Sequence, residues 1–384
     1  MKILYSHRTR SADGQYVHIS ALAEALAARG HEIVMAGPDD TDGRGRRALD
    51  AAAGEGGLRR LLPGAAAELA ELAYSARGYL RLKAKAAGAG ILYERYNLFY
   101  HAGARLARRR GLPFLLEVNA PLAEERARHG GLALKSLARW SEQAIWRAAD
   151  RVLPVSGALA RAVEAAGVAP EKIVVIHNGV GPEFLAAADP RPLRARYALE
   201  DKMVLGFTGF VRDWHGLDRA VRYIAASRRK DLHLLIVGDG TARASLERQA
   251  ASLGIADRLT ITGVVQREAM PAHVAAFDIA LQPAVTAYAS PLKLFEYMAQ
   301  ARPILAPARD NIREVLTDGE DALLFAPDDE GAFAGALDRL VGEPALRGRL
   351  GAAARASLLR QDLTWPANAA RVERLALDLI GERR

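Results

Sequence analysis

The chain of 384 residues contains no cysteine. This absence excludes disulfide bonds, thiolate metal sites and a cysteine nucleophile, although it says little about the cellular compartment. Long apolar runs are missing too, because none approaches the roughly 20 residues that a membrane-spanning helix needs. The apolar run at the start is too short for a signal peptide, so we expect it to form a buried strand in a cytoplasmic protein.

Aromatic residues are scarce, at 6%, and the basic residues are spread along the chain without a nucleic-acid-binding motif. Nucleic acid is therefore not an expected partner. The formal net charge of +8 still indicates an anionic partner, such as a nucleotide, a phosphorylated sugar or an acidic lipid surface. The hydrophobic content of 50% is typical of a globular protein, and the length predicts two to three domains.

Short buried strands alternate with helices through most of the chain, which predicts parallel sheets. The alternation stops around Pro182, Pro190 and Pro192 and then starts again, so we expect an α/β fold of two halves. A segment rich in Gly, Asp and Arg, residues 39–57, is expected to be a surface loop. The expected strands are residues 2–6, 32–36, 91–93, 114–116, 152–155 and 173–176, then 204–207, 234–237, 259–261, 279–281 and 304–306.

A helix start near residue 290 carries the strongest local signal. Ser290 suits the N-cap and Pro291 suits the first helical position. Lys293 in the first turn opposes the helix dipole, which indicates an anion beside it. Glu296 follows on the same face, about 4.5 Å further along the axis. The diphosphate and ribose of a nucleotide would fit this pair, and so would an ordinary capped helix with a solvated Lys–Glu pair.

Polar residues at strand ends are candidates for contacts with a substrate. Glu94 and Arg95 end one expected strand, and Glu117 and Asn119 follow the next. The carboxyl ends of parallel strands border the ligand crevice of an open α/β sheet, although each residue alone is also typical of an ordinary loop. Gly14, in the loop after the first strand, would let a phosphate or sugar approach closely, or it is simply a turn glycine.

Two other patterns have competing interpretations. Gly238-Asp-Gly240 resembles the start of a dinucleotide fingerprint, but Arg243 stands where the third glycine is needed, which disfavours a dehydrogenase. The helix expected over residues 65–85 ends in several cations, and Arg108-Arg-Arg110 follows. These cations indicate either a solvated helix end or a surface that rests on anionic lipid.

The order of the motifs resembles glycosyltransferase family 4 over nearly the whole chain. The residues that carry this resemblance are Gly14, Val155-Ser156, Val175-Ile-His-Asn-Gly-Val180, Gly209 with His215-Gly216, Val237-Gly-Asp-Gly240, Gly263, Asp278, and the Ser290 to Glu296 helix followed by Pro303. The resemblance implies a GT-B fold, with two Rossmann-like parallel-sheet domains facing a central cleft. It assigns residues 1–182 to the acceptor, residues 183–364 to the donor, and a terminal helix, 365–384, to the first domain.

The resemblance further implies a retaining, metal-independent, hexosyltransferase-type enzyme without a cofactor. Its donor would be a nucleotide-diphosphate sugar, with UDP or GDP favoured, and its acceptor a glycan or a lipid-linked sugar in cell-envelope polysaccharide or glycoconjugate synthesis. Peripheral association with the inner face of the membrane is compatible with this role. The implied catalytic residues are Arg212, Lys293 and Glu296; the donor-binding residues are Gly14, Gly209, His215, Gly238, Gly263, Val265, Tyr288, Ser290, Pro291 and Leu292; the acceptor-binding residues are Glu94, Arg95, Glu117 and Asn119.

Four positions depart from the family pattern. Tyr288 stands where the family usually has a second Glu, Phe210 and His215 stand where a phosphate-binding Arg and Lys are usual, and Asn119 replaces a common His. These departures leave open a subgroup with another donor or a weakened enzyme. They also leave open a non-catalytic nucleotide-sugar-binding subunit and a GT-B nucleotide-sugar epimerase.

Overall fold

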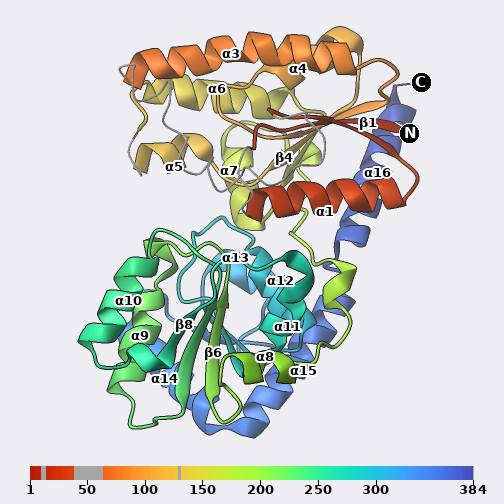
Figure 1. The fold of residues 1–384 in the computed structure, drawn as a ribbon. Helices are drawn as coiled ribbons and strands as arrows, with labels where there is room; N and C mark the ends of the chain where they lie inside the picture. Colours follow the sequence, from red (N-terminus) through yellow and green to blue (C-terminus); the bar gives the residue numbers. More distant parts are fainter. Residues whose placement is uncertain (10–13, 39–63, 129–130, 384) are drawn as a thin grey trace. The chain divides into compact units, whose positions relative to one another are not determined.

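The computed structural model describes residues 1–9, 14–38, 64–128 and 131–383 (Figure 1). The expected surface loop over residues 39–57 lies outside these ranges. Contacts divide the chain into two compact units. Unit 1 consists of Met1–His177, Tyr288–Ser290 and Trp365–Arg384, and unit 2 consists of Asn178–Ala287 and Pro291–Thr364. The division by contacts therefore falls between His177 and Asn178, whereas the sequence placed the boundary after residue 182.

Unit 1 is built on a five-stranded parallel sheet with the order β2-β1-β3-β4-β5. Its strands are β1 (Lys2–Ser6), β2 (Glu32–Ala36), β3 (Ile91–Arg95), β4 (Phe114–Val118) and β5 (Arg151–Pro154). Its helices are α1 (Gly14–Ala28), α3 (Gly64–Lys85), α4 (Ala102–Arg110), α5 (Leu122–Arg128), α6 (Lys135–Ala148), α7 (Gly157–Ala165), η1 (Pro170–Lys172) and α16 (Trp365–Glu382).

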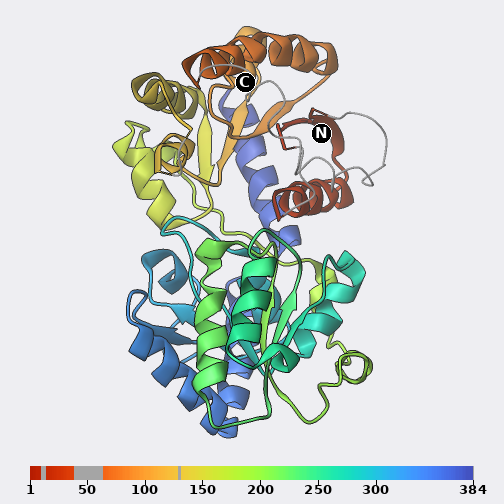
Figure 2. The same cartoon turned by 60° about the vertical axis from the view of Figure 1, so that its left-hand side comes forward.

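Side chains of the first sheet alternate between two buried faces. Leu4 and Leu92 pack with residues of α3, α4, α6 and α7. Ile3, Tyr5 and Tyr93 are buried and point to the opposite face, because successive strand residues alternate. Helices α1 and α16 contact each other and cover that second face (Figures 1 and 2). Helices on both faces explain why most residues of these strands are apolar.

Unit 2 is built on a six-stranded parallel sheet with the order β11-β10-β9-β6-β7-β8. Its strands are β6 (Met203–Thr208), β7 (Leu232–Val237), β8 (Leu259–Ile261), β9 (Ile279–Leu281), β10 (Ile304–Pro307) and β11 (Leu323–Phe325). Its helices are η2 (Pro182–Phe184), α8 (Arg191–Arg196), η3 (Asp213–His215), α9 (Leu217–Ala226), α10 (Arg243–Ser252), η4 (Ala256–Arg258), η5 (Arg267–Ala269), α11 (Met270–Ala275), α12 (Leu292–Ala299), α13 (Asp310–Arg313), α14 (Glu330–Gly342) and α15 (Pro344–Arg360).

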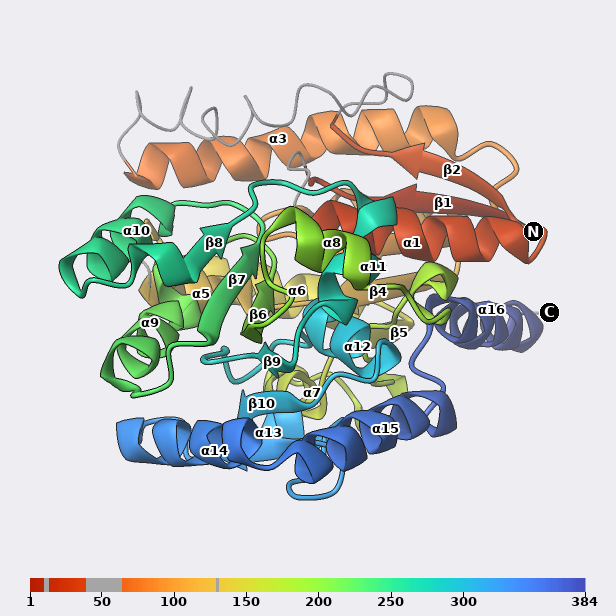
Figure 3. The same cartoon turned by 60° about the horizontal axis from the view of Figure 1, so that its bottom comes forward.

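Two hydrophobic clusters cover the two faces of the second sheet. One cluster contains Leu205 and Leu234 and packs against α9, α10 and α14. The other contains Val204 and Leu235 and packs against α11, α12 and the later turns of α15. Helices α9 and α10 lie side by side in Figure 3, as do α14 and α15. Val204 and Leu205 are adjacent in β6, and Leu234 and Leu235 are adjacent in β7. In each strand the two neighbours belong to different clusters, because successive side chains of a strand point to opposite faces of the sheet.

Several expected elements differ from those observed. The segment over residues 173–176 forms only an isolated bridge, between Val152 and Ile173, although its backbone still bonds to β5. Helix α1 begins at Gly14, so this glycine is the first residue of a helix and does not lie in a loop. Helix α5 and strand β11 were not anticipated, because both are short. In the described ranges, no helix is both long and apolar enough to span a membrane.

Two of the basic residues near the end of α3 are held by the protein itself. Arg81 donates a hydrogen bond to the carbonyl oxygen of Gly37 at 2.9 Å, and Lys85 donates one to that of Met35 at 2.8 Å. Lys83, between them, is exposed. The cations of this helix therefore do not form one solvent-facing stripe, because two of the side chains tie α3 to β2 and to the residue that follows it.

Gly206 in β6 tests how tightly unit 2 is packed. A Cβ atom at this position would lie 2.0 Å from the ring of Phe277, so we expect Gly206→Ala to destabilise the protein by about 1–3 kcal/mol. The control is Gly348→Ala in α15, where no atom lies within 4 Å and alanine favours the helix by about 0.5–1 kcal/mol. Urea unfolding of both variants would measure the difference. Equal stabilities would contradict the packing described.

Candidate functional site

The second sheet has a point at which the strand order reverses. The chain runs outward from β6 through β7 to β8, and then returns to β9 on the other side of β6. Counted from β6, this order is that of dinucleotide-binding α/β folds, in which ligands bind outside the carboxyl ends of the two central strands. The loops after β6 and β9, residues 209–216 and 282–291, therefore border the candidate site.

Glycines let the loops after β6 and β7 approach each other closely. A Cβ atom on Gly238 would lie 2.1 Å from the carbonyl oxygen of Gly209, and one on Gly240 would lie 2.2 Å from that of Val211. The Val211 amide donates to the Asp239 carbonyl at 2.8 Å. The Gly238-Asp-Gly240 motif is thus required by backbone packing, and a direct contact of Gly238 with the donor stays a prediction.

Lys293, in the first turn of α12, lies against the loop after β6. A Cβ atom on Gly209 would stand 3.4 Å from Cε and Nζ of Lys293. The Nζ atom lies 3.9 Å from the centre of the Phe207 ring, a cation–π arrangement. Burial lowers the pKa of the Lys293 ammonium to about 7, although the nearby charge of Glu296 opposes this shift. An anion beside Nζ would favour its charged form.

Glu296 lies one turn further along α12 and faces the end of β6. The Thr208 hydroxyl donates to Oε2 of Glu296 at 3.4 Å. Burial raises the pKa of the Glu296 carboxyl to about 7, partly offset by the charges of Lys293 and Arg267. The carboxylate form could accept hydrogen bonds from a diol. Phe207, Thr208 and Arg267 were not identified from the sequence, although Thr208 directly precedes Gly209.

Arg212 is held between two aromatic rings of the loop after β6. Its guanidinium carbon lies 4.6 Å from the centre of the Phe210 ring and 4.8 Å from that of Trp214. Both rings are exposed, and Arg212 itself is half-buried. The rings keep the guanidinium extended without neutralising its charge, so it remains able to bind an anion.

His215 lies beside Lys293 and Arg212 and is uncharged at neutral pH. Burial, followed by the charges of Lys293 and Arg212, lowers the pKa of its imidazole to about 3. Its Nδ1 accepts a hydrogen bond from the Arg212 amide at 3.3 Å, so Nε2 carries the proton. His215 therefore offers a neutral N–H donor at the position where the family resemblance expects a lysine.

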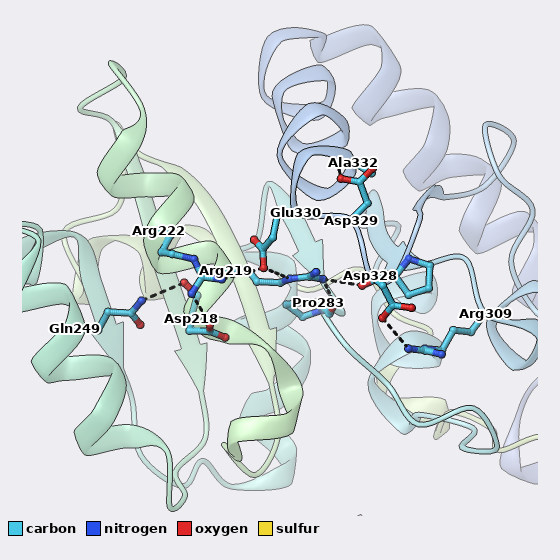
Figure 4. A network of polar contacts seen from close by, with 11 residues as sticks. Asp218, Arg219, Arg222, Gln249, Pro283, Arg309, Asp328, Asp329, Glu330 and Ala332 are labelled. Carbon is cyan, nitrogen blue, oxygen red and sulfur yellow. Dashed lines mark hydrogen bonds and ion pairs between the residues drawn. The ribbon is translucent and has the colours of Figure 1, made fainter.

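Arg219 of α9 fixes the loop that leads to α12 (Figure 4). Its Nη1 donates to the carbonyl oxygens of Pro283 at 3.5 Å and Pro327 at 3.1 Å, and its Nε donates to Glu330 at 2.9 Å. A Cβ atom on Gly216 would lie 3.3 Å from Cβ of Ala284, so the loops after β6 and β9 are in contact. The first residues of the loop after β9 are thus held against α9 and against the loop after β6.

Helix α12 begins one residue later than expected. Pro291 occupies the N-cap position, not the first helical position, and Leu292 is the first helical residue. Ser290 and Tyr288 belong to unit 1 by their contacts, and the Tyr288 carbonyl accepts a hydrogen bond from Ser156 at 2.7 Å. The first amides of α12 still lack partners within the helix, as at any helix N-terminus.

The loop after β8 was expected to line the base of a nucleotide. Gly263 forms an isolated bridge with Gly238 and has a φ of 75°, which favours glycine. Val265 is partly buried and packs against the core of unit 2, whereas Val264 has an exposed fraction of 67%. The exposed apolar side chain of this loop is therefore Val264, and the role given to Val265 stays a prediction.

In unit 1, Glu117 lies at the centre of a buried polar cluster. Its carboxylate accepts hydrogen bonds from His18 at 2.8 Å, Tyr93 at 2.7 Å, Arg95 at 2.5 Å and Asn119 at 2.5 Å. Burial alone would raise the pKa of Glu117, but the charges of His18 and Arg95, with these hydrogen bonds, hold it well below its usual range. Glu117 and Arg95 are both buried, and their predicted contact with an acceptor stays a prediction.

Glu94 is also buried, at the end of β3. Ser6 donates a hydrogen bond to its Oε2 at 2.8 Å, while Oε1 has no partner among the described residues. Burial raises the pKa of the Glu94 carboxyl to about 8, so it is mainly protonated at neutral pH. Its predicted contact with an acceptor also stays a prediction. Of the four acceptor candidates only Asn119 is half-buried, and its role stays a prediction.

A small cavity lies beside the buried polar cluster of unit 1. Its lining includes His18, Trp365, Glu117, His177 and Asn368, and the ring centres of His18 and Trp365 are 4.8 Å apart. Asn368 donates to the His177 carbonyl at 2.8 Å. His18 and Asn368 had no signal in the sequence, since each lies on a helix far along the chain from the residue that it contacts. The described residues include no group of three or more His, Asp or Glu side chains placed to hold a metal ion.

Two family models match the chain. The "Glycosyl transferase 4-like domain" matches residues 13–179, and "Glycosyl transferases group 1" matches residues 202–343. Together with the two parallel-sheet units, these matches define the class of protein. The chain belongs to the GT-B glycosyltransferases of the family 4 type.

Individual relatives support the same assignment. An alpha-D-kanosaminyltransferase from Streptomyces kanamyceticus is 28% identical over 160 residues, which is 41% of each chain. The chain thus spans less than half the length of the first curated relatives that it matches. A GDP-mannose-dependent alpha-mannosyltransferase from Mycolicibacterium smegmatis is 27% identical over 276 residues, 70% of this chain and 68% of the relative.

The structure of Anabaena HepE in complex with UDP and glucose matches with a TM-score of 0.76. The match covers 97% of this chain and 98% of HepE, at 17% sequence identity. At that identity the likeness shows the fold alone, which is the two-domain Rossmann-like GT-B fold.

The protonation of Glu94 should make the stability of the protein depend on pH. Its pKa is raised on folding from 4.5 to about 8, so its favourable contribution is complete below pH 4.5 and is lost as pH rises through 8. Glu94→Gln removes this loss, and we expect the variant to gain about 2–4 kcal/mol over the wild type between pH 4.5 and pH 8.5.

Urea unfolding at several pH values would measure this gain. Glu24→Gln is the matched control, because Glu24 is exposed on α1 and the change should stay within about 0.5 kcal/mol. A constant difference between Glu94→Gln and the wild type across this range would show that Glu94 is ionised in the folded protein.

Proposed function

We propose that the protein is a retaining, metal-independent glycosyltransferase that takes its sugar from a nucleotide diphosphate. The observation that carries this proposal is the position of Lys293 and Glu296 of α12 beside Gly209 and Thr208, at the strand-order reversal of the second sheet. A cation at a helix N-terminus suits a diphosphate, and a carboxyl one turn deeper suits the ribose diol. Family membership supports this use of the site.

In the proposed mechanism, the bond between the sugar and the β-phosphate loosens first, and the acceptor attacks from the same face. The departing β-phosphate takes the proton of the acceptor hydroxyl, so no side-chain base is needed. Lys293, Arg212 and the N-terminus of α12 would stabilise the negative charge that develops on the diphosphate. Neutral His215 would donate a hydrogen bond from Nε2. Catalysis would then consist of positioning and charge stabilisation.

The base of the proposed donor is uracil or guanine. The HepE structure contains UDP, and the mycobacterial relative is named as GDP-mannose-dependent, so UDP and GDP are the nucleotides to test first. The loop with Gly263 and exposed Val264 would lie against the base.

We assign the acceptor to unit 1 and propose a glycan or a lipid-linked sugar of the cell envelope. The net charge of +8 and the exposed cations of α4 support an anionic surface beside this unit. A cytoplasmic protein that associates peripherally with the inner membrane face would meet such an acceptor. Because the buried carboxyls of unit 1 do not face solvent, acceptor recognition would depend on Asn119 and on other loop residues.

A non-catalytic nucleotide-sugar-binding subunit is the second candidate. Phe210 and the uncharged His215 replace the two phosphate-binding cations that the family resemblance expects, which leaves Arg212 and Lys293 as the cations proposed to bind the diphosphate. Turnover of any donor would exclude this candidate.

A nucleotide-sugar epimerase of the same fold would instead change the donor sugar without transferring it. Analysis of the reaction products would distinguish the epimerase from a transferase.

The donor class can be identified by thermal unfolding with UDP, GDP, ADP and TDP, each with and without magnesium. We expect one nucleotide to raise the midpoint by several degrees without metal, since a ligand at 100 times its Kd stabilises by about 2.7 kcal/mol. A shift that requires magnesium would contradict metal independence. No shift with any nucleotide would contradict the assignment of the donor site.

Removal of the Lys293 ammonium tests its role in catalysis. We expect Lys293→Ala to lower kcat/KM by about a hundredfold or more, because one lost contact to the developing charge typically costs about 3 kcal/mol. Lys230→Ala is the matched control. Lys230 is exposed and lies just before the amino end of β7, whereas the donor site borders the carboxyl ends of the strands. Steady-state kinetics with the donor found by thermal unfolding would compare them. Unchanged turnover in Lys293→Ala would remove Lys293 from the mechanism.

Nucleotide affinity should depend on pH through Lys293. The free protein holds the Lys293 pKa at about 7, and a bound diphosphate would raise it, so binding above pH 7 takes up a proton. The affinity should therefore fall as pH rises from 7 to 9, by at most about tenfold per pH unit. Titration calorimetry in buffers of different ionisation enthalpy would count the protons. The arginine of Lys293→Arg stays charged, so the nucleotide affinity of this variant should fall less between pH 7 and pH 9 than that of the wild type. Binding without proton uptake in the wild type would contradict the prediction.

A further inference from the structure

Unit 1 contains a groove that shares no residue with the donor site. It has a volume of about 520 Å3 and lies among α5, α6 and α7, which Figure 1 labels. This volume is in the range of small-molecule sites in proteins. The residues that line it are Pro121, Ala123, Glu124, Ala127, Leu132, Lys135, Arg139, Glu142, Gln143, Trp146, Ala162, Ala165 and Ala166.

Alanines form most of the apolar wall of this groove. Ala123 and Ala127 come from α5, while Ala162, Ala165 and Ala166 come from α7 and the residue after it. The small side chains of these residues leave an apolar space beside them. Such a space suits an unbranched hydrocarbon chain, whose burial is favourable by about 0.8 kcal/mol per CH₂ group.

A buried polar group of the groove lacks a partner. Trp146 has an exposed fraction of only 2%, and its indole Nε1 has no hydrogen-bond acceptor among the described residues. Buried tryptophan N–H groups usually find a partner, because an unpaired one costs free energy. Since Trp146 lines the groove, an oxygen atom of a bound ligand could supply the acceptor.

The basic residues at the groove lack partners among the described residues, whereas the acidic residues have them. Lys135 and Arg139 lie one turn apart on α6, are exposed, and form no ion pair or hydrogen bond with any residue that the structure describes. The acidic groups are occupied: Glu124 pairs with Arg128 at 2.5 Å, and Glu142 accepts from Tyr96 and the Ala123 amide. The unsatisfied groups are therefore donors and cations, which suit an anionic ligand.

We propose that this groove binds a single-chain lipid phosphate. The phosphate head lies between Lys135 and Arg139, and the hydrocarbon chain lies along the alanine wall. Trp146 stands seven residues beyond Arg139, about 10 Å along α6, and donates its indole N–H to an ester or hydroxyl oxygen of the lipid. The proposal concerns binding alone and is independent of the transferase activity, so its failure would leave the proposed function intact.

Equilibrium binding of an acyl-glycerol phosphate, below its micelle concentration, tests the proposal on the full chain. We expect saturable binding that weakens as salt increases, because the head group is held by exposed cations. Inorganic phosphate should bind at least about a hundredfold more weakly, since it lacks the chain. Equal binding of inorganic phosphate would overturn the proposal and leave a simple anion site. No saturable binding of the lipid would overturn it entirely.

Paired variants locate the site. Lys135→Ala with Arg139→Ala should weaken binding about tenfold or more, while Lys83→Ala with Arg108→Ala, an equal loss of exposed charge from α3 and α4, should change it less than about twofold.

Ala165→Leu should block the groove from an exposed position at the end of α7 and weaken binding to a similar extent. Ala84→Leu, near the end of α3, is its control. Equal effects of groove and control variants would overturn the proposal.

Discussion

The half-buried ammonium of Lys293 is the constraint on which the donor site depends. A cation removed from water is unfavourable unless it is paired, and here its protein neighbours are the face of Phe207, a glycine and the carboxyl of Glu296. The neighbouring first turn of α12 carries partial positive charge of its own. The surroundings of Lys293 are thus electrostatically incomplete, and an anion at this position would complete them. This explains why a lysine occupies a place where a carboxylate would stabilise the isolated helix.

The geometry around that ammonium follows from close backbone packing. Gly209 and Gly238 bring two loops within contact distance, Gly216 admits the loop after β9, and Arg219 fixes that loop by hydrogen bonds to carbonyl oxygens. A fold of this type does not specify a reaction by itself, since many α/β proteins share the same strand order. The chemistry depends on which side chains these loops hold at the edge of the sheet.

Unit 1 shows a different use of polar residues at strand ends. Glu117 gathers His18, Tyr93 and Arg95 into a buried network, and Glu94 is buried as a neutral acid. Such networks fix the positions of helices and strands because every partner must be satisfied at once. The same strand-end position that suggested acceptor contacts therefore serves the internal packing of α1 against the first sheet. The indole N–H of Trp146, which has no partner among the described residues, lies instead on α6, away from this network.

The sequence by itself determined the alternation of strands and helices, the two parallel sheets and the pairing of Lys293 with Glu296 on one helix face, because these depend on spacing along the chain. Only the tertiary structure decided which groups meet those side chains. Thr208 reaches Glu296 across 88 residues, and no local pattern encodes that contact. Likewise, the strand end at Glu117 carried no sign of His18, 99 residues away, so its burial could not be foreseen. Local periodicity is set by backbone geometry, whereas burial and pKa depend on neighbours that only folding brings together.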